Sequence, residues 1–189
     1  GFKSISSKSV IRGQLFVEKV LIPSAFIDTI ESQRDHLMYF VNSGVCRSIV
    51  EKGGGVLDIK VSPRPNSVFA IDVFVDVQNA MGANTVNSVL EALKPKVTEL
   101  AVCQILMAIV SNLSPERIIK AFFEIPSDCL SEPGLPGREV ARKVVLATEV
   151  AKHDLFRTTT HNKGIMNGID AVAMAVGQDV RAIEASCHA

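Results

Sequence analysis

The sequence predicts an α+β fold, in which an antiparallel sheet is crossed by helices. Residues 56–61 and 68–77 are strand-like and are separated by a proline-rich turn, which is typical of a hairpin. Along the second strand Phe69, Ile71, Val73 and Val75 point one way and Asp72 and Asp76 the other, as in an antiparallel sheet with one covered face. No GxGxxG follows a strand, so a Rossmann domain is not supported.

The composition indicates a globular protein with no charge preference for nucleic acid or membranes. Of 189 residues, 47% are hydrophobic, and 20 basic side chains balance 20 acidic ones, so we expect neither kind of partner. No apolar run reaches the roughly eighteen residues that span a bilayer. The four cysteines form no CxxC pair, which argues against a zinc site and favours reduced thiols in the cytoplasm.

The remaining elements follow from apolar periodicity and turn residues. A β-prone segment at 14–22 precedes Pro23, a residue suited to the start of a helix. Beyond it we expect helices at 24–41, 45–51 and from Asn84 to Val102, strands at 104–111 and 117–125 that extend the sheet, a loop at 126–137 and a helix at 139–153. The chain opens on glycine without a signal segment and closes inside a helix that begins at Val180, so we expect a fragment of a longer polypeptide.

Two glycine-containing segments are candidates for ligand binding. Gly53–Gly55 removes every Cβ from one spot, so a ligand can approach the backbone there, although a flexible turn is the alternative interpretation. The segment from Asn79 to Asn84 contains Gly82 and leads into a helix. Backbone N–H groups at such a helix N-terminus form an anion site suited to the pyrophosphate of a cofactor.

A polar stretch near the C-terminus is the best candidate for chemistry. Residues 158–164 read as a loop, and the apolar spacing from Ile165 to Val176 predicts that a helix begins directly after it. Lys163 would then face the positive end of the helix dipole, a place unfavourable for a cation. We therefore interpret Lys163 as a candidate working ammonium group.

The spacing between Lys163 and Asp179 prevents contact along one straight helix, because sixteen residues rise roughly 24 Å. If the two act together, either the chain reverses near Gly177 or a second subunit brings one of them in. The simpler alternative is that Asp179 caps the helix that follows it.

Two ordered blocks of sequence resemble one enzyme family. Residues 161–170, followed by 177–179 and 181–185, are similar to the active-site segment of class II, bacterial-type 3-hydroxy-3-methylglutaryl-coenzyme A (HMG-CoA) reductase. Residues 79–87 resemble that family's nicotinamide-cofactor motif, and 111–113 and 53–55 fall in the expected order. The similarity covers essentially the whole chain, and two long blocks are more specific than one short motif.

The resemblance implies an activity and a set of residues. The family reduces the thioester of HMG-CoA to mevalonate and free coenzyme A in two hydride transfers from NADPH or NADH. It implies that Lys163 stabilises charge on the carbonyl oxygen, that Asp179 lies beside that lysine, that Arg157 pairs with the substrate carboxylate and that Asn167 hydrogen-bonds the substrate. The cofactor residues it implies are Asn79, Met81, Gly82, Asn84 and Asn112.

The resemblance also implies an architecture. Residues 6–111 would form the small cofactor-binding domain, and 1–5 and 112–189 would belong to the large domain. The active site would be shared across a homodimer, in the cytoplasm, without nucleic acid, membrane or metal as a partner. Arg47 and Lys52 precede the glycines without a nearby acid at 42–47, so we favour NADPH over NADH.

The chain departs from the family pattern at Asn79, where the motif usually has aspartate, so one acceptor is neutral. The family's catalytic glutamic acid and thiolate-protonating histidine would lie beyond the two ends of this sequence. One alternative is therefore a catalytically silent module that binds coenzyme A or a nucleotide. Another is a different NAD(P)H oxidoreductase that uses Lys163 for a Schiff base or as an acid.

Overall fold

The computed structural model describes residues 1–189, and the chain divides into two compact units. Ser6–Ile119 forms one unit, and Gly1–Ile5 together with Lys120–Ala189 forms the other. The chain therefore passes between the units twice, once after Ile5 and once after Ile119. Each unit is described by itself.

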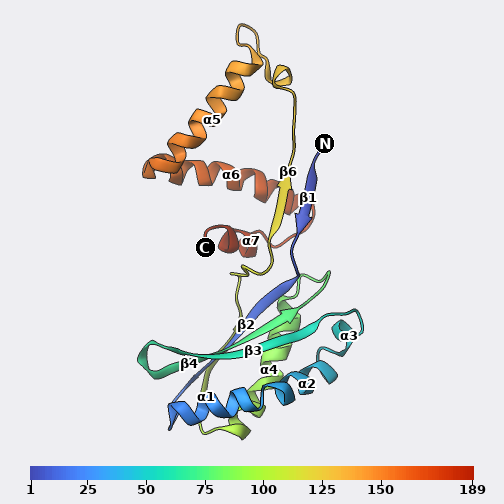
Figure 1. The fold of residues 1–189 in the computed structure, drawn as a ribbon, viewed down its shortest axis with the longest axis vertical. Coiled ribbons are helices and arrows are strands. Elements are labelled where there is room, and N and C mark those ends of the chain that lie inside the picture. Colours follow the sequence, from blue (N-terminus) through green and yellow to red (C-terminus); the bar gives the residue numbers. More distant parts are fainter. The chain divides into compact units, whose positions relative to one another are not determined.

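The unit Ser6–Ile119 is built on a four-stranded antiparallel sheet in the order β3-β4-β2-β5. Along the chain its elements alternate β-α-β-β-α-β, the ferredoxin-like arrangement of a split βαβ unit. Figure 1 shows this sheet with its helices. The strands are β2 (Val10–Glu18), β3 (Gly55–Arg64), β4 (Val68–Asp76) and β5 (Gln104–Val110), and the helices are α1 (Pro23–Ser32), α2 (Arg34–Ser43), α3 (Arg47–Val50) and α4 (Ala83–Leu100).

The core of this unit lies between one face of the sheet and its helices. Inward-facing strand residues such as Leu15 and Val73 pack with Ile30, Leu37 and Leu90 of α1, α2 and α4 in one continuous cluster of buried apolar side chains. Helix α4 approaches the sheet closely at Gly13, where an added Cβ would lie 2.6 Å from Val86 Cγ1. Burial of this apolar surface is the main force that holds the helices on the sheet.

The opposite face of the sheet carries a buried carboxylate. Asp72 is 6% exposed, and it accepts a hydrogen bond from Gln14 Nε2 at 2.8 Å and one from Arg64 Nη2 at 3.3 Å. A buried charge is tolerated when it is paired in this way. The prediction that Asp72 points away from the helices is confirmed, but the residue is almost fully buried.

Two helical predictions need adjustment. The helix expected at 24–41 is divided at Gln33 into α1 and α2, and Arg34, directly after the break, pairs with Asp58 of β3 at 2.9 Å. The stretch expected at 45–51 keeps only the short α3. The hairpin of β3 and β4 is confirmed, and its turn is the short 3-10 segment η1 (Pro65–Ser67), with Asn66 at φ +61°.

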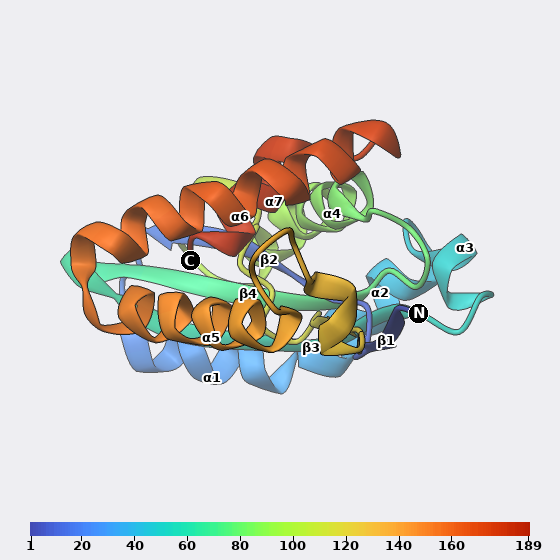
Figure 2. The same cartoon turned by 90° about the horizontal axis from the view of Figure 1, so that it is seen from above.

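The second unit joins a two-stranded sheet to a set of helices. Strand β1 (Lys3–Ser6) pairs with β6 (Ile119–Phe122), and the chain continues through η2 (Ser127–Leu130), α5 (Gly137–His153), α6 (Leu155–Ala175) and α7 (Val180–Cys187). Figure 2 presents the same elements from above. The helix expected at 139–153 is confirmed. Helix α6 is the longest, but no helix of the chain is long and apolar enough to cross a membrane.

The expectation that 117–125 extends the main sheet is wrong. The sheet ends at β3 on one side and at β5 on the other, and neither of these outer strands pairs with β6. Strand β6 pairs instead with β1, a strand that the sequence pattern did not indicate. The rings of Phe2 and Phe123 pack beside this two-stranded sheet, with their centroids 5.0 Å apart.

Candidate cofactor and catalytic sites

Lys163 lies in the interior of α6, not in a loop before it, so the sequence prediction of a helix N-terminus here is wrong. The helix begins earlier because Asp154 caps it: its carboxylate accepts a hydrogen bond from the Arg157 N–H at 2.7 Å. The threonines that suggested a loop return their hydroxyls to the helix backbone, as Thr159 does to the Leu155 carbonyl at 3.0 Å. The helix dipole therefore gives no reason to single out Lys163.

The neighbours of Lys163 on the helix surface give a better reason to consider it a functional residue. Lys163, Asn167 and Asp170 are spaced four and three residues apart, so they share one face of α6. Lys163 and Asn167 are exposed, and Lys163 forms no ion pair with any carboxylate of this chain. One carboxylate oxygen of Asp170 is buried without a hydrogen-bond partner. This face presents a cation, an amide and a carboxylate along one line.

The chain turns at Gly177 after α6, which is one of the two alternatives that the sequence left open. Gly177 adopts φ +71°, the Gly177 N–H donates to the Met174 carbonyl at 3.1 Å, and the Gln178 N–H donates to the Ala173 carbonyl at 2.8 Å. This is the Schellman pattern that ends a helix with a left-handed glycine. The two apolar segments are therefore separate helices, and Lys163 and Asp179 are not on one straight rod.

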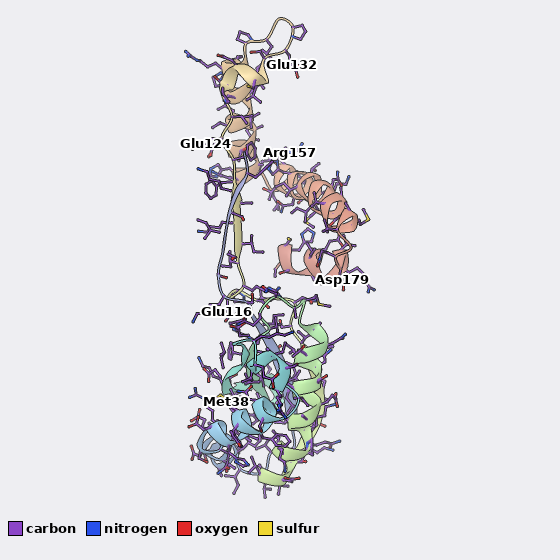
Figure 3. The ribbon with its side chains drawn as sticks, turned by 90° about the vertical axis from the view of Figure 1, so that its right-hand side faces the viewer. Met38, Glu116, Glu124, Glu132, Arg157 and Asp179 are labelled. Atoms are coloured by element: carbon purple, nitrogen blue, oxygen red, sulfur yellow. The ribbon has the colours of Figure 1, made fainter.

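Asp179 has the capping role that was the simpler alternative. Its carboxylate accepts hydrogen bonds from the N–H groups of Arg181 at 3.1 Å and Ala182 at 3.3 Å, at the start of α7. The side chain keeps 47% of its surface exposed. Figure 3 labels Asp179 at this helix start and Arg157 near the beginning of α6. Within this chain Asp179 does not pair with Lys163, and a role beside that lysine stays a prediction.

The second candidate site surrounds the segment from Gln78 to Gly82, which we call the cofactor loop. It begins with a strained residue: Gln78 has φ +55°, and its N–H donates to the Asp76 carboxylate at 2.9 Å. Left-handed conformations are uncommon for residues with a side chain and persist when neighbouring contacts hold them. Asp76, at the end of β4, supplies that contact.

Gly82 directly precedes α4 and is buried against Ile11 of β2 and Val77, the residue after β4. It has φ +95°, and an added Cβ would lie 2.7 Å from both Ile11 Cδ1 and Val77 Cγ2. The N–H groups of Met81 and Gly82 donate to no group of the chain. They lie at the positive end of the eighteen-residue helix α4, so the geometry of an anion site is present. Asn79, Met81 and Asn84 are exposed around it.

The glycine turn lies beside the cofactor loop. A hollow of about 470 Å³ is lined by residues from α3 and the turn and by residues 77–80, and it includes Lys52. An added Cβ on Gly54 would meet the Asp76 carbonyl and come within 2.9 Å of Gln78 Cγ. The backbone of the turn therefore lies directly against the end of β4 and the start of the cofactor loop.

Two basic side chains near the glycine turn differ in their partners. Arg47 pairs with Glu51 at 3.2 Å, whereas Lys52 forms no ion pair.

The amide of Asn42 binds both the N–H and the carbonyl of Val56, at 2.7 and 3.0 Å. Cys46 is fully buried in the adjoining turn, and burial raises the pKa of its thiol.

Asn112 belongs to a segment that is fixed on the same unit. It is exposed in a turn in which the Leu113 N–H donates to Ser111 Oγ at 3.2 Å. Further along, Arg117 donates to the carbonyls of Ala80 and Met81 in the cofactor loop. The structure thus brings Asn79, Met81, Gly82, Asn84 and Asn112 into one unit, and it places Arg157, Lys163, Asn167 and Asp179 in the other.

Four contributors to these sites had no clear signal in the sequence. Asp76 and Gln78 read only as the end of a strand, Asp170 as a polar residue on a helix, and Arg117 as part of an alternating run. The only signal for Asp76 was that an acidic residue ends the strand just before the loop. Nothing in the sequence connects Arg117 to a loop 36 residues away.

Comparisons with known proteins identify the family of the chain. Residues 1–189, the entire chain, match the family model described as hydroxymethylglutaryl-coenzyme A reductase. The chain belongs to that family. A relative with this name from Archaeoglobus fulgidus is 35% identical over 192 residues, which cover 100% of this chain and 42% of the relative. A probable 3-hydroxy-3-methylglutaryl-coenzyme A reductase from Borreliella burgdorferi is 30% identical over 173 residues, which cover 84% of this chain and 39% of the relative.

Solved structures of the family have the same fold. The 3-hydroxy-3-methylglutaryl-coenzyme A reductase of Streptococcus pneumoniae superimposes with a TM-score of 0.85 at 40% identity, over 98% of this chain and 50% of that one. The class II enzyme from the same organism, bound to NADPH in open conformations, gives a TM-score of 0.84 at 40% identity, over 98% of this chain and 45% of that one. The non-Rossmann α+β prediction is confirmed. The chain spans half or less of the length of these relatives.

Proposed function

We propose that this chain carries the cofactor-binding part and the lysine-bearing part of an NADPH-dependent HMG-CoA reductase. The observation that carries the proposal is the cofactor loop, where two unpartnered N–H groups at the N-terminus of α4 adjoin a hollow lined by Lys52. Such a helix terminus suits a pyrophosphate. Family membership over the whole chain supports the same conclusion.

The reaction consumes two hydrides. HMG-CoA, two NADPH and two protons give mevalonate, coenzyme A and two NADP⁺. Each hydride adds to a carbonyl carbon, so negative charge develops on the oxygen. Lys163 stabilises that charge by donating a hydrogen bond from its ammonium group, and it is free for this because it has no ion pair within the chain.

The other side chains bind and orient. Asn167 shares the helix face of Lys163 and hydrogen-bonds the substrate. Arg157 pairs with the substrate's free carboxylate through its planar fork. Asp179 orients the ammonium of Lys163 from across a homodimer interface, since within one chain it caps α7 and pairs with Arg181 but does not reach Lys163. Asn79 contributes a neutral amide where the family usually has a carboxylate.

The cofactor is NADPH, and Lys52 supplies the positive charge for a phosphate. It lines the hollow and forms no ion pair, whereas Arg47 is engaged with Glu51. The S. pneumoniae relative bound to NADPH supports the same choice. The comparison of kcat/KM for the two cofactors tests this, and we expect NADPH to be preferred; a strong preference for NADH would contradict it.

The division of the chain and its surroundings complete the proposal. Residues 6–111 form the small domain, with 1–5 and 112–189 in the large one; the compact unit Ser6–Ile119 supports the first boundary but extends past the second by eight residues, 112–119. The partners are HMG-CoA, coenzyme A and a second copy of the polypeptide. Four free thiols fit the reducing cytoplasm.

Mevalonate formation tests the activity. In the full-length polypeptide, NADPH oxidation should depend on HMG-CoA, and mevalonate should appear at one mole for each two moles of NADPH consumed. A protein that binds NADPH and coenzyme A but forms no mevalonate would instead be the silent binding module. A protein that binds neither would contradict the assignment of the cofactor loop as well.

A further inference from the structure

Arg117 contacts the cofactor loop from a segment distant in sequence. Its guanidinium spans two consecutive peptide carbonyls: Nη2 donates to Ala80 O at 3.3 Å and Nη1 donates to Met81 O at 3.1 Å. A planar fork with two parallel N–H groups is suited to such a pair of acceptors. A single ammonium group lacks such a planar pair of parallel donors.

Because a peptide unit is planar, a bond that fixes its carbonyl also fixes the direction of its N–H group. The chain has no cis peptide bonds, and in a trans peptide the N–H points away from the preceding carbonyl. Fixing the Ala80 carbonyl therefore directs the Met81 N–H away from Arg117. Fixing the Met81 carbonyl does the same for the Gly82 N–H. These are the two N–H groups that donate to no group of the chain.

The segment that carries Arg117 is anchored on both sides. Glu116 pairs with Arg12 of β2 at 3.0 Å, and its carbonyl accepts a hydrogen bond from Ser7 Oγ at 2.8 Å. The Ile118 N–H donates to the same Ser7 hydroxyl at 2.7 Å. Arg117 is half-buried between these two fixed neighbours. Its reach to the loop is therefore set by the fold and not by a freely moving side chain.

We infer that Arg117 is a positioning residue for cofactor binding: it holds the carbonyls of Ala80 and Met81 so that the N–H groups of Met81 and Gly82 face the cofactor's phosphates. This rests on the proposed function. Arg117 acts through the loop backbone and makes no contact with the cofactor itself. Its contribution is preorganisation, since donors already aimed at the anion lose little freedom when it binds.

The test measures NADPH binding by fluorescence titration in the full-length protein, first for the natural sequence and then for variants. We expect Arg117→Ala to weaken NADPH binding about tenfold to a hundredfold, as for the loss of hydrogen bonds to a charged group. The KM for HMG-CoA should stay unchanged. Lys120→Ala removes a neighbouring exposed cation without such contacts, and it should leave NADPH affinity unchanged.

Two further variants separate positioning from simple charge. Arg117→Lys keeps the positive charge and Arg117→Gln keeps one N–H donor group, but neither keeps the fork, so both should bind NADPH more weakly than the natural protein. The difference in NADPH affinity between the natural protein and the variants should also persist at high salt. Salt would reduce that difference if Arg117 attracted the phosphates directly by its charge, because salt screens such an attraction. Natural affinity in the Lys variant with loss in the Gln variant would overturn the inference.

The controls keep each outcome interpretable. Thermal unfolding identifies the variants that fold, and if Arg117→Ala does not, the Lys and Gln variants carry the test. If the natural protein fails to bind NADPH, the proposed function is contradicted. If it binds NADPH and the folded variants bind equally well, the function stands and the role of Arg117 is refuted.

Discussion

Lys163 illustrates how a residue's neighbours on a helix decide what it can do. It lies in the interior of α6, exposed and unpaired, with Asn167 one turn further on the same face. The sequence predicted a role for Lys163 from its place at a helix N-terminus, and that physical argument is wrong because the residue lies inside the helix. Resemblance to the family located Lys163 independently of its local structure.

Replacing Lys163 by alanine should lower kcat far more than it raises KM. The ammonium acts on charge that exists mainly in the transition state, and losing one such donor typically costs about a hundred- to thousandfold, or about 3–4 kcal/mol. Steady-state kinetics with HMG-CoA and NADPH measure both constants. Lys143→Ala, which removes an exposed lysine of α5, is the matched control. A change confined to KM would assign Lys163 to binding only.

Cys46 offers a prediction about pH. Burial raises the pKa of its thiol, so the folded protein holds this proton to a higher pH than the unfolded chain does. Its contribution to stability is fully present below the thiol pKa of the unfolded chain, and it is lost as the pH rises through the higher pKa of the folded state. Urea unfolding above pH 9, the ordinary value, should therefore show a smaller alkaline loss of stability for Cys46→Ala than for the natural protein. Equal losses would contradict the assignment.

At the scale of elements, local patterns predicted most of the secondary structure. The β3–β4 hairpin, α4 and α5 were recognisable because each is specified by its own turn residues and apolar spacing. The start of α6 was missed because threonine, histidine and asparagine favour loops unless their side chains bond within the helix. The partner of β6 was missed because strand pairing depends on which edges the rest of the sheet leaves free.

The same glycine-to-alanine change should have opposite effects in two elements. At Gly54 a Cβ would come 2.8 Å from Ile49 Cγ2 and would also meet the Asp76 carbonyl, so we expect a loss of about 1–3 kcal/mol from overpacking. At Gly164, inside α6, an added Cβ meets nothing within 4 Å. There we expect a gain of roughly 0.5–1 kcal/mol from helix propensity. Urea unfolding measures both, and a stabilised Gly54→Ala would refute the close approach.

For the whole molecule, the two candidate sites lie in separate compact units. Composition alone allowed either one domain or two. The prediction of a boundary at residue 111 came from the family resemblance. Long-range contacts such as the hydrogen bond from Arg117 to the Met81 carbonyl could not be predicted from the sequence, because no local pattern encodes a bond between a guanidinium and a remote carbonyl.

A mixed-dimer experiment tests whether Lys163 and Asp179 work across subunits. Subunits carrying Lys163→Ala and Asp179→Ala, each inactive alone, are co-expressed with different affinity tags, and the mixed species is purified. If each subunit completes the other's site, mevalonate formation should return in part. Continued inactivity of a folded mixed dimer would place both residues of a working site in one chain. A fully active monomer on sizing chromatography would contradict the dimer.

The Asn42 amide has a consequence for how the protein avoids joining its neighbours. Strand β3 lies at the outer edge of the sheet, where free N–H and C=O groups would invite a foreign strand to pair. Asn42 satisfies both backbone groups of Val56, and the irregular register between Val56 and Asp58 and the proline at position 63 interrupt the remainder. The edge nearest the glycine turn is therefore protected from edge-to-edge aggregation. Asn42→Ala should expose the N–H and C=O groups of Val56, and a strand of another molecule could then pair with them at high protein concentration.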